Sequence, residues 1–101
     1  MNPYVELQAV ANGDAGALRQ LIADCYATAT REEDWAALIE ALLLARLTCA
    51  RTGEPRDGQT LRGLLAFAID TLDPEDDRET LRCFTAEVAA LDPWLDEAGA
   101  N

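Results

Sequence analysis

Cysteine, arginine and carboxylate side chains are the main groups in this chain that could do chemistry, because histidine, lysine and serine are all absent. Without histidine, no side chain has an unperturbed pKa near neutrality, and neither a Cys–His pair nor a histidine-containing metal site can form. The lack of serine and lysine excludes a serine nucleophile and a Schiff base as well. No glycine-rich phosphate-binding loop is present. The sequence therefore predicts a protein that is not an enzyme and that binds no cofactor.

The three cysteines, Cys25, Cys49 and Cys83, are widely spaced and form no Cys-x-x-Cys pair. An odd number of cysteines at such spacing is not a disulfide framework, so we expect reduced thiols and a cytoplasmic protein. Cys25 and Cys49 fall on apolar stripes of their predicted helices and are expected to be small core residues. Cys83 groups with carboxylates, which disfavour the thiolate, so we expect little reactivity from it.

The acidic run at residues 73–79 has the spacing of the first ligands of a calcium-binding EF-hand loop. The position that requires glycine is Arg78, however, and the position that requires glutamate is Phe84. Asp73-Pro74 is typical of a helix start, where acidic side chains interact favourably with the helix dipole. We therefore expect no metal here and interpret the run as a helix cap.

A formal net charge of −11 on 101 residues limits the partners that the chain can have. This charge repels nucleic-acid phosphates and anionic membrane surfaces, so we expect no direct binding to either. The first residues lack the basic and apolar regions of a signal peptide, and the most apolar run, residues 41–50, contains Arg46 and is too short to span a bilayer. Arginine without lysine is typical of high-GC bacterial genomes; adaptation to high salt in archaea is the alternative.

Helical periodicity runs along the chain and no segment alternates with period two, which predicts an all-α fold. We expect five main helices plus a short C-terminal helix that follows Asp92-Pro93. The expected N-caps of the five main helices are Asn2, Asp14, Thr30, Asp57 and Asp73. Residues 1–101 are expected to form a single α-helical domain, arranged as a compact antiparallel bundle or as stacked helical hairpins.

The helix predicted over residues 30–51 has an apolar surface wider than the stripe of an ordinary surface helix. Leu44 lies between Glu40 and Thr48 on the side expected to face solvent, and Leu47 widens the apolar face. Either neighbouring helices cover this surface, or it contacts another chain, for example in an isologous homodimer. Trp94 either closes the bundle or contacts a partner. The candidate partner-binding residues are therefore Leu44, Leu47 and Trp94.

Gly63 lies in the interior of the helix predicted to follow Asp57, where glycine is less favourable than alanine by about 1 kcal/mol. One explanation is a close crossing with another helix. The alternative is that the backbone of a ligand or a partner approaches at this position.

Once catalysis is excluded, binding is the function that we expect. We interpret the chain as a small acidic protein that acts through protein–protein interaction, as an adaptor, a chaperone or a regulatory subunit, with another protein or a second copy as its partner. One alternative is an acidic antagonist that mimics nucleic acid and binds a basic protein. Another is a helical sensor that binds a small anionic ligand through arginines such as Arg46, Arg51 or Arg62, although ion pairing with surface acids also explains these side chains.

Overall fold

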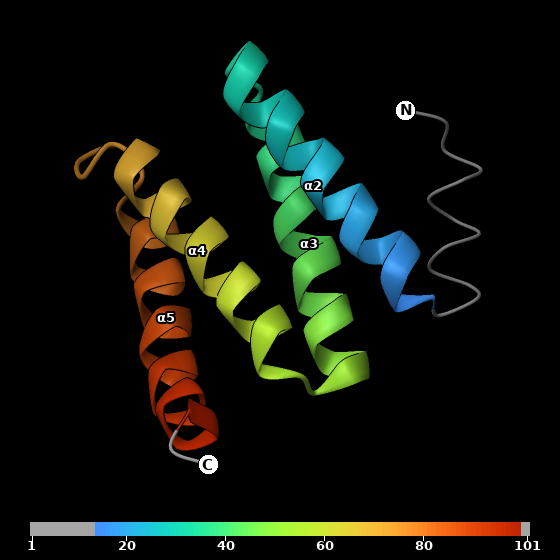
Figure 1. The fold of residues 1–101 in the computed structure, drawn as a ribbon. Helices are drawn as coiled ribbons and strands as arrows, with labels where there is room; N and C mark the ends of the chain where they lie inside the picture. Colours follow the sequence, from blue (N-terminus) through green and yellow to red (C-terminus); the bar gives the residue numbers. More distant parts are fainter. Residues whose placement is uncertain (1–13, 100–101) are drawn as a thin grey trace.

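The computed structural model describes residues 14–99, which form four α-helices with no strand among them (Figure 1). The helices are α2 (Ala15–Glu32), α3 (Trp35–Thr52), α4 (Pro55–Thr71) and α5 (Arg78–Gly99). Consecutive helices pack antiparallel in a compact bundle, which confirms the all-α prediction. The helix expected after Asn2 lies outside the described residues. The described residues contain the other four of the five expected main helices, and the short C-terminal helix expected after Pro93 is not separate but part of α5.

Helix α3 begins at a different residue from the one that the sequence predicts. Thr30 lies inside α2, where its hydroxyl donates to two carbonyl oxygens of the preceding turn. Asp34 is the N-cap of α3, and its carboxylate accepts hydrogen bonds from two backbone N–H groups of the first turn. The prediction of Thr30 as the cap was wrong because a threonine hydroxyl can bond to its own helix and so remain within it.

The predicted caps of the last two helices are also displaced. Helix α4 begins at Pro55, so Asp57 lies in its first turn and does not cap it. Asp73 instead caps a turn before α5, since its carboxylate accepts from two backbone N–H groups in that turn. Helix α5 continues through Pro93, and the side chains of the next two residues pack against α4 at Gly58. That packing accounts for the absence of a helix break at the proline.

The helices form two layers, with α2 and α4 in one layer and α3 and α5 in the other (Figure 1). In the described part of the chain, backbones approach closely only between consecutive helices. Alternate helices are joined by long side chains: Arg19 of α2 reaches Asp57 of α4, and Arg46 of α3 reaches Glu87 of α5. The space between α2 and α4 is therefore bridged by side chains and not filled by a helix.

Helix α3 is central because both α2 and α4 pack against it. The largest fully buried side chains include Leu18, Leu38, Leu42 and Leu65, contributed by these three helices. Covering from two sides accounts for the wide apolar surface of α3. Leu44 is only 8 % exposed, so the first of the two explanations, covering by neighbouring helices, accounts for this side chain. Leu43, the preceding residue, is 57 % exposed.

Candidate functional site

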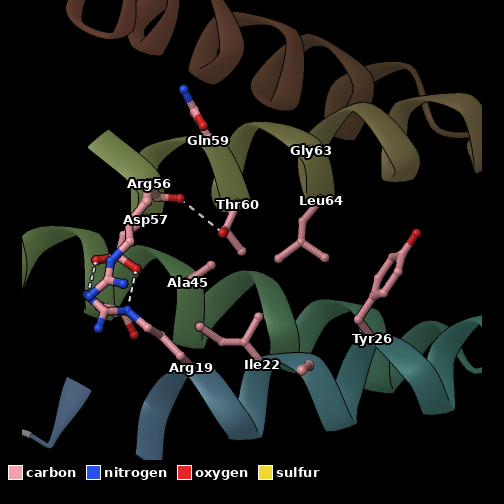
Figure 2. A pocket seen from close by; sticks show the side chains of 12 residues that line it. Arg19, Ile22, Tyr26, Ala45, Arg56, Asp57, Gln59, Thr60, Gly63 and Leu64 are labelled. Atoms are coloured by element: carbon pink, nitrogen blue, oxygen red, sulfur yellow. Dashed lines mark hydrogen bonds and ion pairs between the residues drawn. The ribbon is translucent and has the colours of Figure 1, made fainter. Parts of the chain in front are cut away.

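A hollow of about 450 Å³ lies between α2 and α4, and we call it the central hollow (Figure 2). Ala45 and Thr48 of α3 line its base, and the walls include Ile22 and Tyr26 of α2 and Gly63 and Leu64 of α4. This volume is within the range of about 300–1,000 Å³ that is typical of ligand pockets. The Thr48 hydroxyl donates to the carbonyl oxygen of Leu44 at 2.8 Å, so its one donor is used within α3. The base of the hollow is therefore mainly apolar.

A cluster of charged side chains closes one end of the central hollow (Figure 2). Arg19 binds Asp57 through two hydrogen bonds, with Nε 2.9 Å from Oδ1 and Nη2 2.8 Å from Oδ2. Arg19 also pairs with Glu54, which accepts from Arg56 Nε at 3.1 Å. The hydroxyl of Thr52 donates to Asp57 at 2.5 Å. The charged side chains at this end are thus paired with one another within the chain.

The arginine contact has a marked effect on Asp57, a carboxylate that is only 4 % exposed. Hydrogen bonds from Arg19 lower the pKa of Asp57 to about 2, against the opposing effect of burial, and Thr52 adds to the lowering. The same contact raises the pKa of Arg19 above its ordinary value. Both groups are charged at neutral pH, and the pair links α2 to α4.

An aromatic contact bounds the other end of the central hollow. The rings of Tyr26 on α2 and Phe67 on α4 meet edge to face, with centroids 5.5 Å apart and planes at 76°. Beyond this pair lies a second hollow of about 510 Å³, which we call the Trp35 hollow; Leu38, Phe67 and Trp35 line it together with Glu33 and Asp34. The Tyr26–Phe67 pair therefore divides one groove between α2 and α4 into two compartments.

The two glycines inside α4 have different surroundings. A Cβ atom at Gly58 would overlap the indole of Trp94 and would lie 3.1 Å from Leu95 Cδ2. A Cβ atom at Gly63 would have no atom within 4 Å. Close helix packing therefore explains Gly58 but not Gly63. At Gly63 the missing side chain leaves the wall of the central hollow open.

The three residues predicted to bind a partner are not among those that line the two hollows. Leu44 is buried in the core, Leu47 is partly buried against it, and Trp94 packs on Gly58. A partner-binding role for them stays a prediction. Tyr26 and Trp35, which line the hollows, were not identified from the sequence. Tyr26 adjoins the apolar stripe of α2, and Trp35 is the first residue of α3. At both positions the sequence pattern is the same whether the side chain is buried or exposed.

Two of the three arginines considered for an anionic ligand are ion-paired. Arg46 binds Glu87 through two hydrogen bonds of 2.7 and 2.8 Å, which raise the pKa of Arg46. Arg62 pairs with Asp92. Ordinary ion pairing thus accounts for Arg46 and Arg62.

The cysteines and acids offer little further chemistry in residues 14–99. Cys25 is buried, Cys49 is partly buried and Cys83 is exposed. Burial raises the pKa of the Cys49 thiol, which disfavours its reactive form. Within the same residues, no three cysteine or carboxylate side chains come together as metal ligands could.

None of the four described helices has the length and apolar character required to cross a membrane. No family model, no curated protein and no solved structure matches this chain.

Proposed function

We propose that this protein is a non-catalytic binding module, acting as an adaptor, a chaperone or a regulatory subunit, that binds a segment of a partner protein in the groove between α2 and α4. In this proposal an apolar side chain of the segment enters the central hollow. Ile22 and Leu64 in its walls and Ala45 at its base provide an apolar surface for such a side chain.

The observation that carries the proposal is Gly63. Alanine would be more favourable here by about 1 kcal/mol, and its methyl group would meet no other atom of the described chain. Neither helix propensity nor internal packing therefore explains the glycine. An open wall that a partner can approach does explain it, since glycine allows the closest approach to a helix backbone.

The groove is also held in shape before any partner arrives. The Arg19–Asp57 pair fixes the distance between α2 and α4 at one end, and the Tyr26–Phe67 contact does so at the other. A preformed site requires less ordering on binding than a site that must assemble. This rigidity supports recognition of a short segment with few contacts.

Internal charge pairing favours an apolar group over a small anion as the occupant of the central hollow. The two arginines that line it, Arg19 and Arg56, already bind carboxylates of the chain itself. An anion would have to displace Glu54 or Asp57 from them. An apolar side chain needs no such exchange.

Selection from a random 12-residue peptide library on phage tests this proposal. The library is panned against the wild-type protein alone, and the affinity of each selected peptide is then measured for the wild type and for the Gly63→Leu variant, in which a side chain fills the central hollow. We expect selected peptides to bind the wild type at least about tenfold more tightly than Gly63→Leu, because loss of one buried apolar side chain changes affinity by that order.

The matched control is Ala66→Leu, which adds a similar side chain to an exposed position of the same helix that lines neither hollow. Selected peptides should bind this variant as they bind the wild type. Failure to enrich any peptide, or equal binding to Gly63→Leu, would contradict the proposal.

A further inference from the structure

The Trp35 hollow continues the groove past the Tyr26–Phe67 pair, so a segment bound in the central hollow can extend into it. Its surface combines the aromatic side chains of Trp35 and Phe67 with the apolar Leu38. The Trp35 side chain is 38 % exposed although it is large and apolar. An aromatic surface is thus available to a bound group.

The two hollows differ in charge. In the central hollow, Arg19 and Arg56 balance the nearby carboxylates. In the Trp35 hollow, Glu33 and Asp34 are present and no arginine lines the surface. Among the described residues, no ion pair joins either acid to a basic side chain. The Asp34 carboxylate is compensated in part by the two backbone N–H groups of α3 that it caps, so Glu33 is the acid of this hollow whose charge is left for a bound group.

Glu33 also occupies an unusual backbone position. It follows the last residue of α2 in the left-handed conformation, with φ 52° and ψ 41°. Glycine is the usual residue at such a position, because a Cβ atom is disfavoured there. Glu33 is thus a glutamate where glycine would be more favourable, whereas Gly63 is a glycine where alanine would be. Departures from local preference are expected at functional sites, and these two line the same groove.

We infer that the Trp35 hollow binds an arginine side chain of the same partner segment whose apolar side chain enters the central hollow, an inference that rests on the proposed function. The planar guanidinium stacks on the exposed face of Trp35, as cations do on aromatic rings. The Glu33 carboxylate accepts its hydrogen bonds and neutralises its charge. The partner segment therefore carries an apolar residue and, beyond the Tyr26–Phe67 pair, an arginine.

The indole N–H signals of the two tryptophans test this inference directly by NMR. The probe is N-acetyl-arginine methylamide, and its control is the citrulline analogue, which has a similar shape but no charge. We expect the arginine probe to shift the Trp35 signal and to leave the Trp94 signal in place, with a smaller effect of the citrulline probe.

Charge variants make the test specific to Glu33. Glu33→Gln should weaken binding of the arginine probe about two- to fivefold, the size expected for an exposed ionic or cation–π contact. Glu32→Gln is the matched control, since it removes the same charge from the neighbouring residue, which pairs with Arg31 outside both hollows. Glu32→Gln should leave the affinity for the probe unchanged.

The outcomes separate this inference from the proposed function. Equal shifts with both probes, or equal affinity of the arginine probe for Glu33→Gln and Glu32→Gln, would overturn the inference, whereas selected peptides could still bind the wild type more tightly than Gly63→Leu. Selected peptides that bind the wild type more tightly than Gly63→Leu but contain no arginine would also overturn the inference and leave the proposed function intact. Enrichment of an arginine in those peptides, together with weaker binding to Glu33→Gln, would support it. If no peptide depends on Gly63, the proposed function fails and the inference fails with it.

Discussion

Helix α4 has one face toward α5 and one toward α2, and each face contains a glycine for a different reason. Toward α5, Gly58 makes room for Trp94, and a methyl group there would overlap the indole. Toward α2, Gly63 borders the central hollow and leaves empty space. The comparison shows that a helical glycine indicates a packed crossing only when a neighbour occupies the position of its missing side chain.

The forces on the two faces differ as well. The face toward α5 is held mainly by apolar packing around Gly58, because its ion pair between Arg62 and Asp92 is nearly half exposed. The face toward α2 is held by the largely buried Asp57 and by one aromatic contact. Exposed ion pairs contribute little to stability, whereas removing one partner of a buried pair has a large effect. The stability of the face toward α5 therefore depends mainly on side-chain volume, and that of the face toward α2 depends mainly on charge.

The largest effect is expected from filling the packed position. Gly58→Leu should lower the free energy of unfolding by about 3 kcal/mol, because the new side chain must displace Trp94 from a well-packed contact. Urea denaturation followed by circular dichroism measures this change. Ala66→Leu on the same helix should remain within about 0.5 kcal/mol of the wild type. If Gly58→Leu lowers the free energy of unfolding by less than about 1 kcal/mol, packing of the Trp94 indole on Gly58 is not important for stability.

The next largest effect is expected from removing a charge, and its size should differ between the two faces of α4. Asp57→Asn should lower the free energy of unfolding at pH 7 by about 2 kcal/mol, since Arg19 loses its main partner. Asp92→Asn breaks the exposed pair with Arg62 and should lower it by less than about 1 kcal/mol. Equal effects of the two substitutions would contradict the assignment of charge to the α2 face.

The Arg19–Asp57 pair predicts that the free energy of unfolding depends on pH. The pKa of Asp57 is about 2 in the folded protein and about 4 in an unfolded chain, so its stabilising effect is complete above about pH 4. It is lost as the pH falls from about 4 to 2. The difference in unfolding free energy between the wild type and Asp57→Asn should therefore shrink over this interval, as measured by urea denaturation at several pH values. A constant difference would argue against the Arg19–Asp57 pair.

The smallest effect is expected at the open glycine, with the opposite sign. Gly63→Ala should raise the free energy of unfolding by about 1 kcal/mol, because alanine favours the helix and its methyl group meets no neighbour. The midpoint of thermal unfolding should rise accordingly. Destabilisation instead would mean that Gly63, like Gly58, is closely packed.

The sequence was sufficient for the helical class and for the burial of Cys25 on α2, since apolar spacing follows helical geometry. It was not sufficient for the helix ends. Thr30 had a suitable type and spacing for a cap but bonds to its own helix. Pro93 predicted a break, yet α5 continues because the residues after it pack on α4. Such outcomes depend on contacts between segments that local patterns do not contain.

The candidate site was only partly accessible from sequence. The unfavourable position of Gly63 could be recognised, but the choice between a close crossing and an open wall required its neighbours in space. Leu43 and Leu44 are adjacent leucines of one helix, and only the placement of the flanking helices decides which is covered. The Arg19–Asp57 pair joins residues 38 positions apart, with no local signal that connects them.

The zigzag order of the helices has a consequence for folding. Because backbones in the described range meet closely only between consecutive helices, most contacts are local in sequence, and chains of this kind fold rapidly. The contacts that frame the groove are among the exceptions, since Arg19–Asp57 and Tyr26–Phe67 both join α2 to α4. The groove can form only when α2 and α4 have both packed against α3. Its assembly thus follows the formation of the separate contacts of α2 and α4 with α3.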